Sequence, residues 1–238
     1  MSADGIRLNK YLASAGLGSR RAVEELVREG VVRLNSHVVT DLATRVQPED
    51  HVTVRRRAVR PQQRLTAVLN KPRGYLCSRA RDKGAKTIFE LLPKNWPRVF
   101  YAGRLDKDSQ GLVLLTTDGE LAQGLAHPSR KVPKIYEVSL DRPFRGDEDA
   151  PRLLKGINLE GKPAKFDRIE RIGAKQIRVT LTQGLKRQIR LMLLYQGYKV
   201  KRLVRTQLGG LSLGKLPVGR WRILDESELA TIFDAAER

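Results

Sequence analysis

The 238-residue sequence has little of the chemistry that metal sites and disulfides need. It holds a single cysteine, Cys77, and three widely separated histidines, His37, His51 and His127. One thiol excludes an intramolecular disulfide and is typical of a reducing compartment, and the His and Cys positions have no zinc-ligand spacing. No apolar run approaches the length of a membrane span, and the first residues lack the features of a signal peptide. We therefore expect a cytoplasmic protein with no metal and no membrane partner.

Several nucleotide-binding and hydrolytic motifs are also missing. The sequence contains no Gly-Lys-Ser/Thr of a phosphate-binding loop and no Gly-x-Ser-x-Gly elbow. Residues 106–111 begin like a calcium loop, but Gln110 occupies the fifth place and Thr117 the twelfth, where a glutamate is required. Asp106 and Asp108 match the two acids of a glycosidase by count, although acids this close in a loop often point apart. The sequence predicts no cofactor.

Acidic residues are scarce. The sequence has 26 Asp and Glu against 46 Lys and Arg, a formal charge of +20. No acid occurs from position 171 to position 224, a stretch that carries thirteen basic residues, among them Lys186, Arg187, Arg190, Lys199, Lys201, Arg202 and Arg205. A solvated surface usually mixes both signs, so a partner rich in phosphate explains the stretch better than a generally basic proteome does.

Residues 1–60 have the pattern of a small separate module. Leu8 and Leu12 recur at helical spacing, and Ser19 can cap a second helix from Arg20 to Glu29. Short β-type runs follow at 31–34, 37–39 and 51–54. Residues 55–63 are polar, charged and contain Pro61, which favours a flexible linker over a strand end with a loop.

From residue 64 to residue 238 the sequence is rich in strand patterns. Runs of strand type at 66–70, 112–116, 134–140 and 199–207 alternate with helical patterns at 87–92, 119–126, 147–155, 186–195 and 226–236. The mixture predicts an α+β fold with a mainly antiparallel mixed sheet.

Residues 101–112 carry the most informative carboxylate. Arg104 precedes Asp106 by two positions, and glycines at 103 and 111 permit sharp turns on both sides. A lone acid in basic surroundings is held ionised by nearby positive charge. The pattern suits an enzyme that places one carboxylate against a polyanion, although a turn-capping acid has the same local sequence.

The first module resembles an S4-type RNA-binding domain. The resemblance rests on residues 7–13 (Arg-Leu-Asn-Lys-Tyr-Leu-Ala), 18–21 (Gly-Ser-Arg-Arg) and 30–35. It implies phosphate contacts for four side chains on one side of a helix pair, which are Arg7, Lys10, Arg20 and Arg21. An ordinary charged helical hairpin is the alternative.

The remainder resembles the RsuA/RluB/RluE/RluF group of pseudouridine synthases, which modify ribosomal RNA. Six segments carry the resemblance in order, at residues 69–74, 103–106, 117–121, 134–138, 183–190 and 203–206. The implied reaction breaks the N-glycosidic bond of a uridine, turns the base and rejoins it through carbon. No redox carrier or metal is needed for this isomerisation.

The resemblance also implies roles for particular residues. Asp106 is the essential acid, which attacks the sugar or removes a sugar proton, and both roles need the ionised form. Arg190 is the arginine beside that carboxylate, and Tyr136 packs against the everted base. Arg104 holds the site open or contacts RNA, with a salt bridge to Asp108 as its alternative. Phosphate contacts are also expected from Lys71 and Arg187.

The resemblance favours a monomer that acts on ribosomal RNA or a ribosomal precursor particle. The segments near 107–110 and 125–130 match different branches of the group, so the sequence does not decide which ribosomal subunit contains the modified RNA. The 23S RNA is favoured over the 16S RNA. A non-catalytic RNA-binding or ribosome-assembly protein on the same scaffold is the alternative function.

Overall fold

The computed structural model describes residues 5–79 and 84–234 and divides the chain into two compact units. The first unit comprises Met1–Leu65 together with Asn95–Val99, and the second comprises Thr66–Lys94 and Phe100–Arg238. The division after residue 65 lies near the predicted boundary at 60–64. The sequence analysis did not predict that residues 95–99 join the first unit.

Two helices form the core of the first unit. α1 (Leu8–Ser14) buries Leu8 and Leu12, and α2 (Arg20–Arg28) buries Val23 and Val27. The side chain of Ser19 accepts a hydrogen bond from the backbone N–H of Ala22 at 3.2 Å, the N-cap that the sequence predicts. Apolar spacing and the cap therefore account for this helix pair.

Short strands complete the first unit. One sheet has the order β3-β2-β5-β6, and β1 pairs with β4. The bounds are β1 (Ile6–Arg7), β2 (Val32–Leu34), β3 (His37–Val38), β4 (Arg45–Val46), β5 (Val52–Val54) and β6 (Arg57–Ala58). The expected linker at 55–63 is partly wrong, because Arg55 and Arg56 take positive φ angles of 48° and 65° in the turn of the β5–β6 hairpin.

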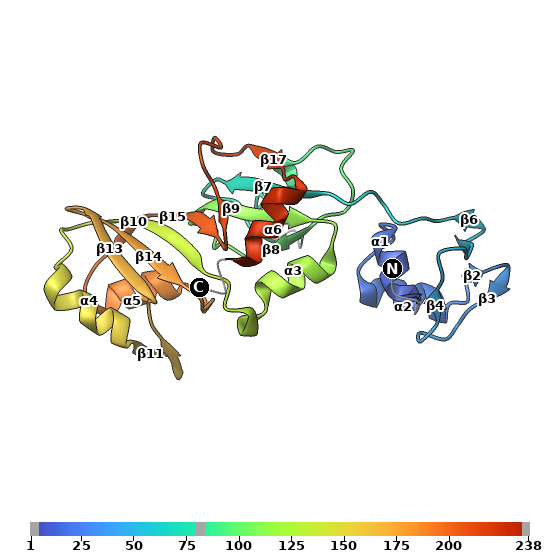
Figure 1. The fold of residues 1–238 in the computed structure, drawn as a ribbon, viewed down its shortest axis with the longest axis horizontal. Coiled ribbons are helices and arrows are strands. Elements are labelled where there is room, and N and C mark those ends of the chain that lie inside the picture. Colours follow the sequence, from blue (N-terminus) through green and yellow to red (C-terminus); the bar gives the residue numbers. More distant parts are fainter. Residues whose placement is uncertain (1–4, 80–83, 235–238) are drawn as a thin grey trace. The chain divides into compact units, whose positions relative to one another are not determined.

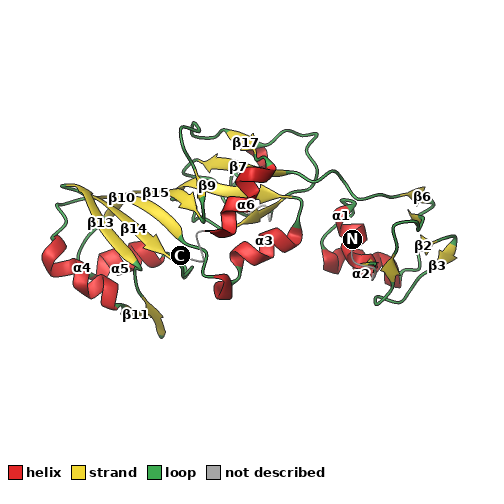
Figure 2. Cartoon of the chain, viewed as in Figure 1, coloured by secondary structure: helices red, strands yellow, loops and turns green. Residues whose placement is uncertain are grey.

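A nine-stranded sheet forms the centre of the second unit (Figure 1). Its order is β13-β14-β10-β15-β9-β7-β17, with β16 paired to β15 and β8 paired to β9. The β9–β15 pair is parallel and the other strand pairs of this sheet are antiparallel, which confirms the α+β class (Figure 2). The bounds are β7 (Thr66–Lys71), β8 (Phe100–Ala102), β9 (Gln110–Thr116), β10 (Lys134–Leu140), β13 (Arg168–Gly173), β14 (Gln176–Leu181), β15 (Val200–Leu208), β16 (Leu211–Ser212) and β17 (Trp221–Ile223). A separate two-stranded sheet joins β11 (Ile157–Leu159) to β12 (Lys162–Ala164).

Burial explains where the strands lie in this sheet. Every residue of β7 and β9 is buried, as expected for strands covered on both faces. β10 instead buries Tyr136, Val138 and Leu140 in alternation, so one of its faces is more open. The core cluster includes Leu112 and Leu114 of β9.

Five helices of the second unit lie where the sequence predicts them, one of them (119–126) with the predicted bounds, and the short helix at 128–130 was not predicted. They are η1 (Ile88–Leu91), α3 (Gly119–Ala126), η2 (Pro128–Arg130), α4 (Gly146–Lys155), α5 (Gln188–Tyr195) and α6 (Glu226–Asp234). α5 begins two residues later than predicted because Arg187 has a left-handed φ of 54°. Residues 235 and 236, predicted in the last helix, lie outside the described residues. In Figure 1, α4 and α5 lie on one side of the β13–β14–β10–β15 end of the sheet.

Candidate active site

Asp106 lies in the turn that joins β8 to β9. The two strands pair antiparallel, from Phe100↔Thr116 to Ala102↔Leu114, so residues 103–109 form a loop closed at its base. The N–H of Ser109 donates to the carbonyl oxygen of Asp106 at 3.0 Å. Asp106 is half-buried, and its carboxylate makes no hydrogen bond or ion pair with any residue in the described ranges. The backbone of this turn is therefore fixed while its carboxylate stays available.

Lys71, at the end of β7, holds the inside of this turn. Its side chain is fully buried, and its Nζ donates to the carbonyl oxygens of Ser109 at 2.7 Å and Asp106 at 3.1 Å. Further bonds of 3.0 and 3.4 Å reach the carbonyl oxygens of Pro72 and Lys107. Burial lowers the pKa of Lys71 to about 8, and nearby Cys77 and the loop acids partly oppose that shift. The phosphate contact predicted for Lys71 is wrong, because this ammonium is directed at backbone carbonyls inside the protein.

Arg205, on β15, holds the two ends of the same turn. Its side chain is 1% exposed, its Nε donates to the carbonyl oxygen of Leu112 at 2.7 Å, and its Nη2 donates to that of Gly103 at 2.6 Å. The sequence analysis counted Arg205 among the basic residues expected at a phosphate-rich partner. Its position after two apolar strand residues, Leu203 and Val204, is a signal of burial that the sequence analysis did not use.

The ion pairs of the site fall on Asp108 and not on Asp106. Nη2 of Arg190 donates to the carbonyl oxygen of Asp108 at 3.0 Å, and Nε lies 3.2 Å from its carboxylate, an ion pair without hydrogen-bond geometry. Arg187 binds the same carboxylate with two bonds of 3.2 Å. Burial raises the pKa of Asp108, but the two guanidinium groups outweigh it and hold that pKa below its usual value.

This geometry corrects two sequence-based expectations. Arg190 does stand at the Asp106 turn, and Asp106 is among the charges that act on it, but its direct partner is Asp108. Burial is the main reason that the pKa of Arg190 is lowered. The alternative salt bridge from Arg104 to Asp108 is also wrong, since Arg187 and Arg190 occupy that carboxylate.

Tyr136 lies on the sheet face that leads to this turn. It stands directly across from Arg205 of β15 and Val179 of β14, and cross-strand partners point to the same face. Arg205 in turn reaches both ends of the Asp106 turn. Tyr136 is 8% exposed, so only a small part of the residue meets solvent. On the same face, burial lowers the pKa of Lys134 to about 8, and its Nζ donates to the carbonyl oxygen of Val132 at 2.9 Å.

The remaining predicted cations are at or near the surface. Arg104 is exposed, and its side chain has no partner among the described residues. Arg187 is exposed apart from its pair with Asp108. The four predicted for the first unit are exposed or half-buried around its helix pair, and they are Arg7, Lys10, Arg20 and Arg21.

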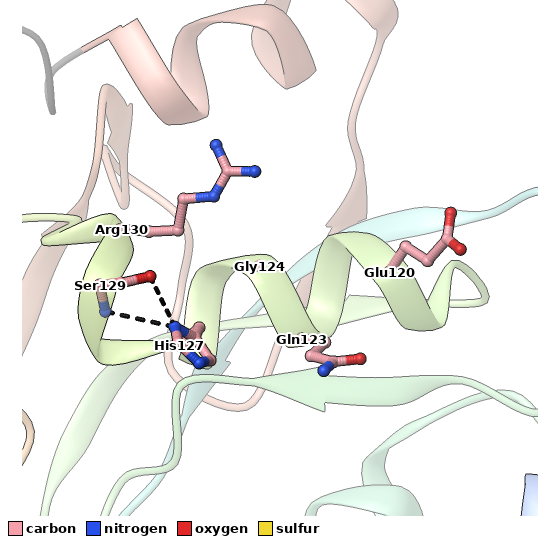
Figure 3. A pocket seen from close by; sticks show the side chains of 6 residues that line it. All are labelled: Glu120, Gln123, Gly124, His127, Ser129 and Arg130. Atoms are coloured by element: carbon pink, nitrogen blue, oxygen red, sulfur yellow. Dashed lines mark hydrogen bonds between the residues drawn. The ribbon is translucent and has the colours of Figure 1, made fainter.

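A surface hollow of about 260 Å³ lies along α3 and η2, and its lining contains none of the predicted RNA-binding residues (Figure 3). Its lining includes His127, whose Nδ1 lies 2.7 Å from Oγ of Ser129. None of the side chains predicted for catalysis lines it. Within residues 5–79 and 84–234, no group of three His, Cys, Asp or Glu side chains is arranged to hold a metal ion. In the same ranges, no helix is both long and apolar enough to span a membrane.

Comparison with known proteins identifies the family. The sequence pattern of RNA pseudouridylate synthases matches residues 66–195, and that of the S4 domain matches residues 6–52. The chain therefore belongs to the RNA pseudouridylate synthase family, with an S4 domain ahead of the catalytic part. It is an enzyme of this class, an RNA pseudouridine synthase.

Relatives from several bacteria cover nearly the whole chain. An uncharacterized RNA pseudouridine synthase of Aquifex aeolicus is 42% identical over 97% of this chain and 94% of that protein. The dual-specificity RNA pseudouridine synthase RluF of Shigella flexneri is 36% identical over 98% of this chain and 80% of that protein. A crystal structure of a pseudouridylate synthase superposes with a TM-score of 0.68 at 27% identity and covers 96% of this chain and 100% of that one. This family membership favours the enzyme over the non-catalytic alternative.

Proposed function

We propose that this enzyme converts a specific uridine of ribosomal RNA to pseudouridine, with 23S RNA favoured over 16S RNA, and that Asp106 is its catalytic residue. The observation that carries the assignment is an unpaired carboxylate on a turn whose backbone is held by Lys71 and Arg205. A preorganised group loses little freedom when the substrate arrives, which favours the reaction.

The reaction that we assign to Asp106 balances without a cofactor. The bond between uracil N1 and ribose C1′ breaks, a bond between uracil C5 and C1′ forms, and the proton of C5 is replaced by one on N1. Asp106 acts as a nucleophile at the ribose or as a base toward a ribose proton, and each role requires the carboxylate. Tyr136 packs against the everted base, while Arg190 holds the neighbouring Asp108.

Substrate binding is assigned to the basic residues outside the turn. Arg104 and Arg187 contact the RNA near the target nucleotide, and the first unit grips RNA with Arg7, Lys10, Arg20 and Arg21. We propose that the protein works as a monomer in the cytoplasm, on ribosomal RNA or on a ribosomal precursor particle. No metal or cofactor takes part.

The variant Asp106→Asn tests this function. It keeps the size of the side chain and removes the carboxylate, so pseudouridine formation is expected to fall at least ~10²-fold while RNA affinity stays near the wild-type value. Wild type and variant are incubated with unmodified 23S and 16S transcripts, and pseudouridine is mapped by chemical labelling and sequencing. Asp147→Asn, at an exposed site on α4, is the matched control.

Two outcomes would overturn different parts of the proposal. Unchanged turnover in Asp106→Asn removes Asp106 from the mechanism. Product in 16S RNA alone, formed by the wild-type enzyme, overturns the preference for 23S RNA and leaves the reaction intact.

A further inference from the structure

The outer side of α5 exposes two apolar side chains next to the cations of the site. Tyr195 is 73% exposed and Leu194 is 55% exposed, and Tyr195 is the most exposed large hydrophobic residue in the described part of the chain. The opposite side of the helix is buried, with Met192 and Leu193 fully covered. A partner that covers these side chains would remove apolar surface from water, and this burial would stabilise the complex.

This outer side of α5 is continuous with the Asp106 turn. With about 100° of rotation per residue, Leu194 lies on the same side of α5 as Arg190, four positions before it, and Tyr195 is the next residue. Arg187 stands at the start of α5 and binds the carboxylate of Asp108. Tyr195 is the last residue of α5 and lies five positions after Arg190, so its Cα is ~7.5 Å farther along the helix axis. A molecule bound at the turn that continues along α5 reaches Tyr195.

The segment after α5 brings further positive charge to this surface. Nη1 of Arg190 donates to the carbonyl oxygen of Val200 at 3.1 Å, so the chain beyond Tyr195 returns to the side of the catalytic turn. Lys199 and Lys201 on this returning segment are exposed. Two acids near this surface have partners: Asp108 binds Arg187 and Arg190, and Asp141 accepts a hydrogen bond from the N–H of Lys199 at 2.8 Å.

We propose that Tyr195 is a stacking platform for an unpaired base of the RNA substrate, a few nucleotides from the target uridine. This inference rests on the proposed function, because it assumes that RNA occupies the Asp106 turn. An exposed aromatic ring amid cations is the combination that binds single-stranded RNA, since phosphates meet the charges and a base covers the ring. A second copy of this chain fits less well, because each copy carries a formal charge of +20.

The experiment compares Tyr195→Ala, Tyr195→Phe and a control, Ile223→Ala. Ile223 is 56% exposed on β17 and lies outside α5. Dissociation constants are measured by filter binding with unmodified 23S and 16S transcripts at fixed salt. Loss of base stacking in Tyr195→Ala is expected to raise the dissociation constant about 5- to 150-fold. Tyr195→Phe keeps the ring and is expected to remain within about twofold of the wild type.

Each outcome separates this inference from the proposed function. Equal affinity of wild type and Tyr195→Ala, with active wild-type enzyme, overturns the role of Tyr195 and leaves the enzymatic assignment intact. Weak binding by both Tyr195→Ala and Ile223→Ala also overturns it, because the loss is then not specific to α5. A concentration-dependent dimer of the free protein that Tyr195→Ala abolishes, with unchanged RNA affinity, assigns the surface to a second copy instead.

Discussion

The ammonium of Lys71 lies 3.1 Å from the carbonyl oxygen of Asp106, so a buried cation on β7 holds the backbone of the proposed catalytic residue from behind. Its shorter bond, 2.7 Å to Ser109, fixes the far side of the same turn. The position of the carboxylate is therefore set by a contact that spans two strands and not by the loop sequence alone.

Replacing Lys71 by Met is expected to lower the free energy of unfolding by about 1–3 kcal/mol, because buried carbonyl oxygens lose their donor. The Asp106 turn also loosens, so kcat/KM falls. Urea unfolding and a pseudouridine assay measure the two effects, with Lys155→Met at an exposed site on α4 as the control. A Lys71→Met protein as stable and active as this control would contradict the assignment.

The lowered pKa of Lys71 gives a pH dependence of defined sign. Because burial lowers its pKa to about 8 and the unfolded value is about 10.5, the unfolded chain binds more protons between these values. The penalty for burying the charge is fully present below pH 8, so the contribution of Lys71 to stability rises as pH increases from 8 to 10.5. Lys134, with a pKa also near 8, contributes in the same direction.

The test therefore compares how the free energy of unfolding changes with pH in the wild type and in a variant without Lys71. Urea unfolding of wild type and Lys71→Met at pH 7, 8.5 and 10 should show a smaller rise in stability with pH for the variant. Parallel curves would show that Lys71 does not titrate in this range. Wild-type activity is expected to decline above pH 8, as the ammonium loses a proton that the turn needs.

Arg190 and Arg187 share Asp108 but are not equivalent. The side chain of Arg190 is 11% exposed and also donates to the carbonyl oxygens of Asp108 and Val200, whereas that of Arg187 is 42% exposed and has only the ion pair. Arg190→Ala is expected to cost about 1–3 kcal/mol of unfolding free energy and most of the activity. Arg187→Ala should cost at most about 1 kcal/mol.

Urea unfolding and steady-state kinetics of the two arginine variants provide the comparison. Equal losses of stability and activity in both variants would mean that the ion pair with Asp108, and not the hydrogen bonds of Arg190 to backbone carbonyls, determines the effect. The double variant with Asp108→Ala then measures the coupling of each arginine to that acid.

Gly111 permits the parallel contact between β9 and β15. It pairs with Arg205 at a φ of +114°, and a Cβ there would lie 2.3 Å from the carbonyl oxygen of Arg205. Gly111→Ala is expected to destabilise the protein by at least ~2 kcal/mol, since strand separation also displaces the Arg205 guanidinium. The free energy of unfolding and the soluble yield are measured.

Gly146→Ala is the matched control for this change. Gly146 begins α4, and a Cβ there would have no neighbour within 4 Å, so the substitution should be neutral or stabilising by up to about 1 kcal/mol. A tolerated Gly111→Ala would show that the two strands separate at low cost.

Much of the fold follows from local sequence. Apolar spacing predicts α1 and α2, Ser19 predicts the cap, and the apolar run at 112–115 predicts the central strand β9. These predictions succeed because periodicity and capping involve residues within one turn or one strand. The pairing of β1 with β4 and the inclusion of residues 95–99 in the first unit were missed, since both depend on contacts between distant segments.

The sequence by itself determined the family pattern, the α+β class, the excess of positive charge and the position of the candidate carboxylate at Asp106. Only the tertiary structure decided what the cations do: Lys71 and Arg205 bind backbone carbonyls in the interior, Arg190 binds Asp108, and Arg104 stays at the surface. The physical reason is that a sequence shows a lysine or arginine only as a cation and not what that cation contacts. Whether it meets phosphate, carboxylate or a buried carbonyl depends on which strands fold over it.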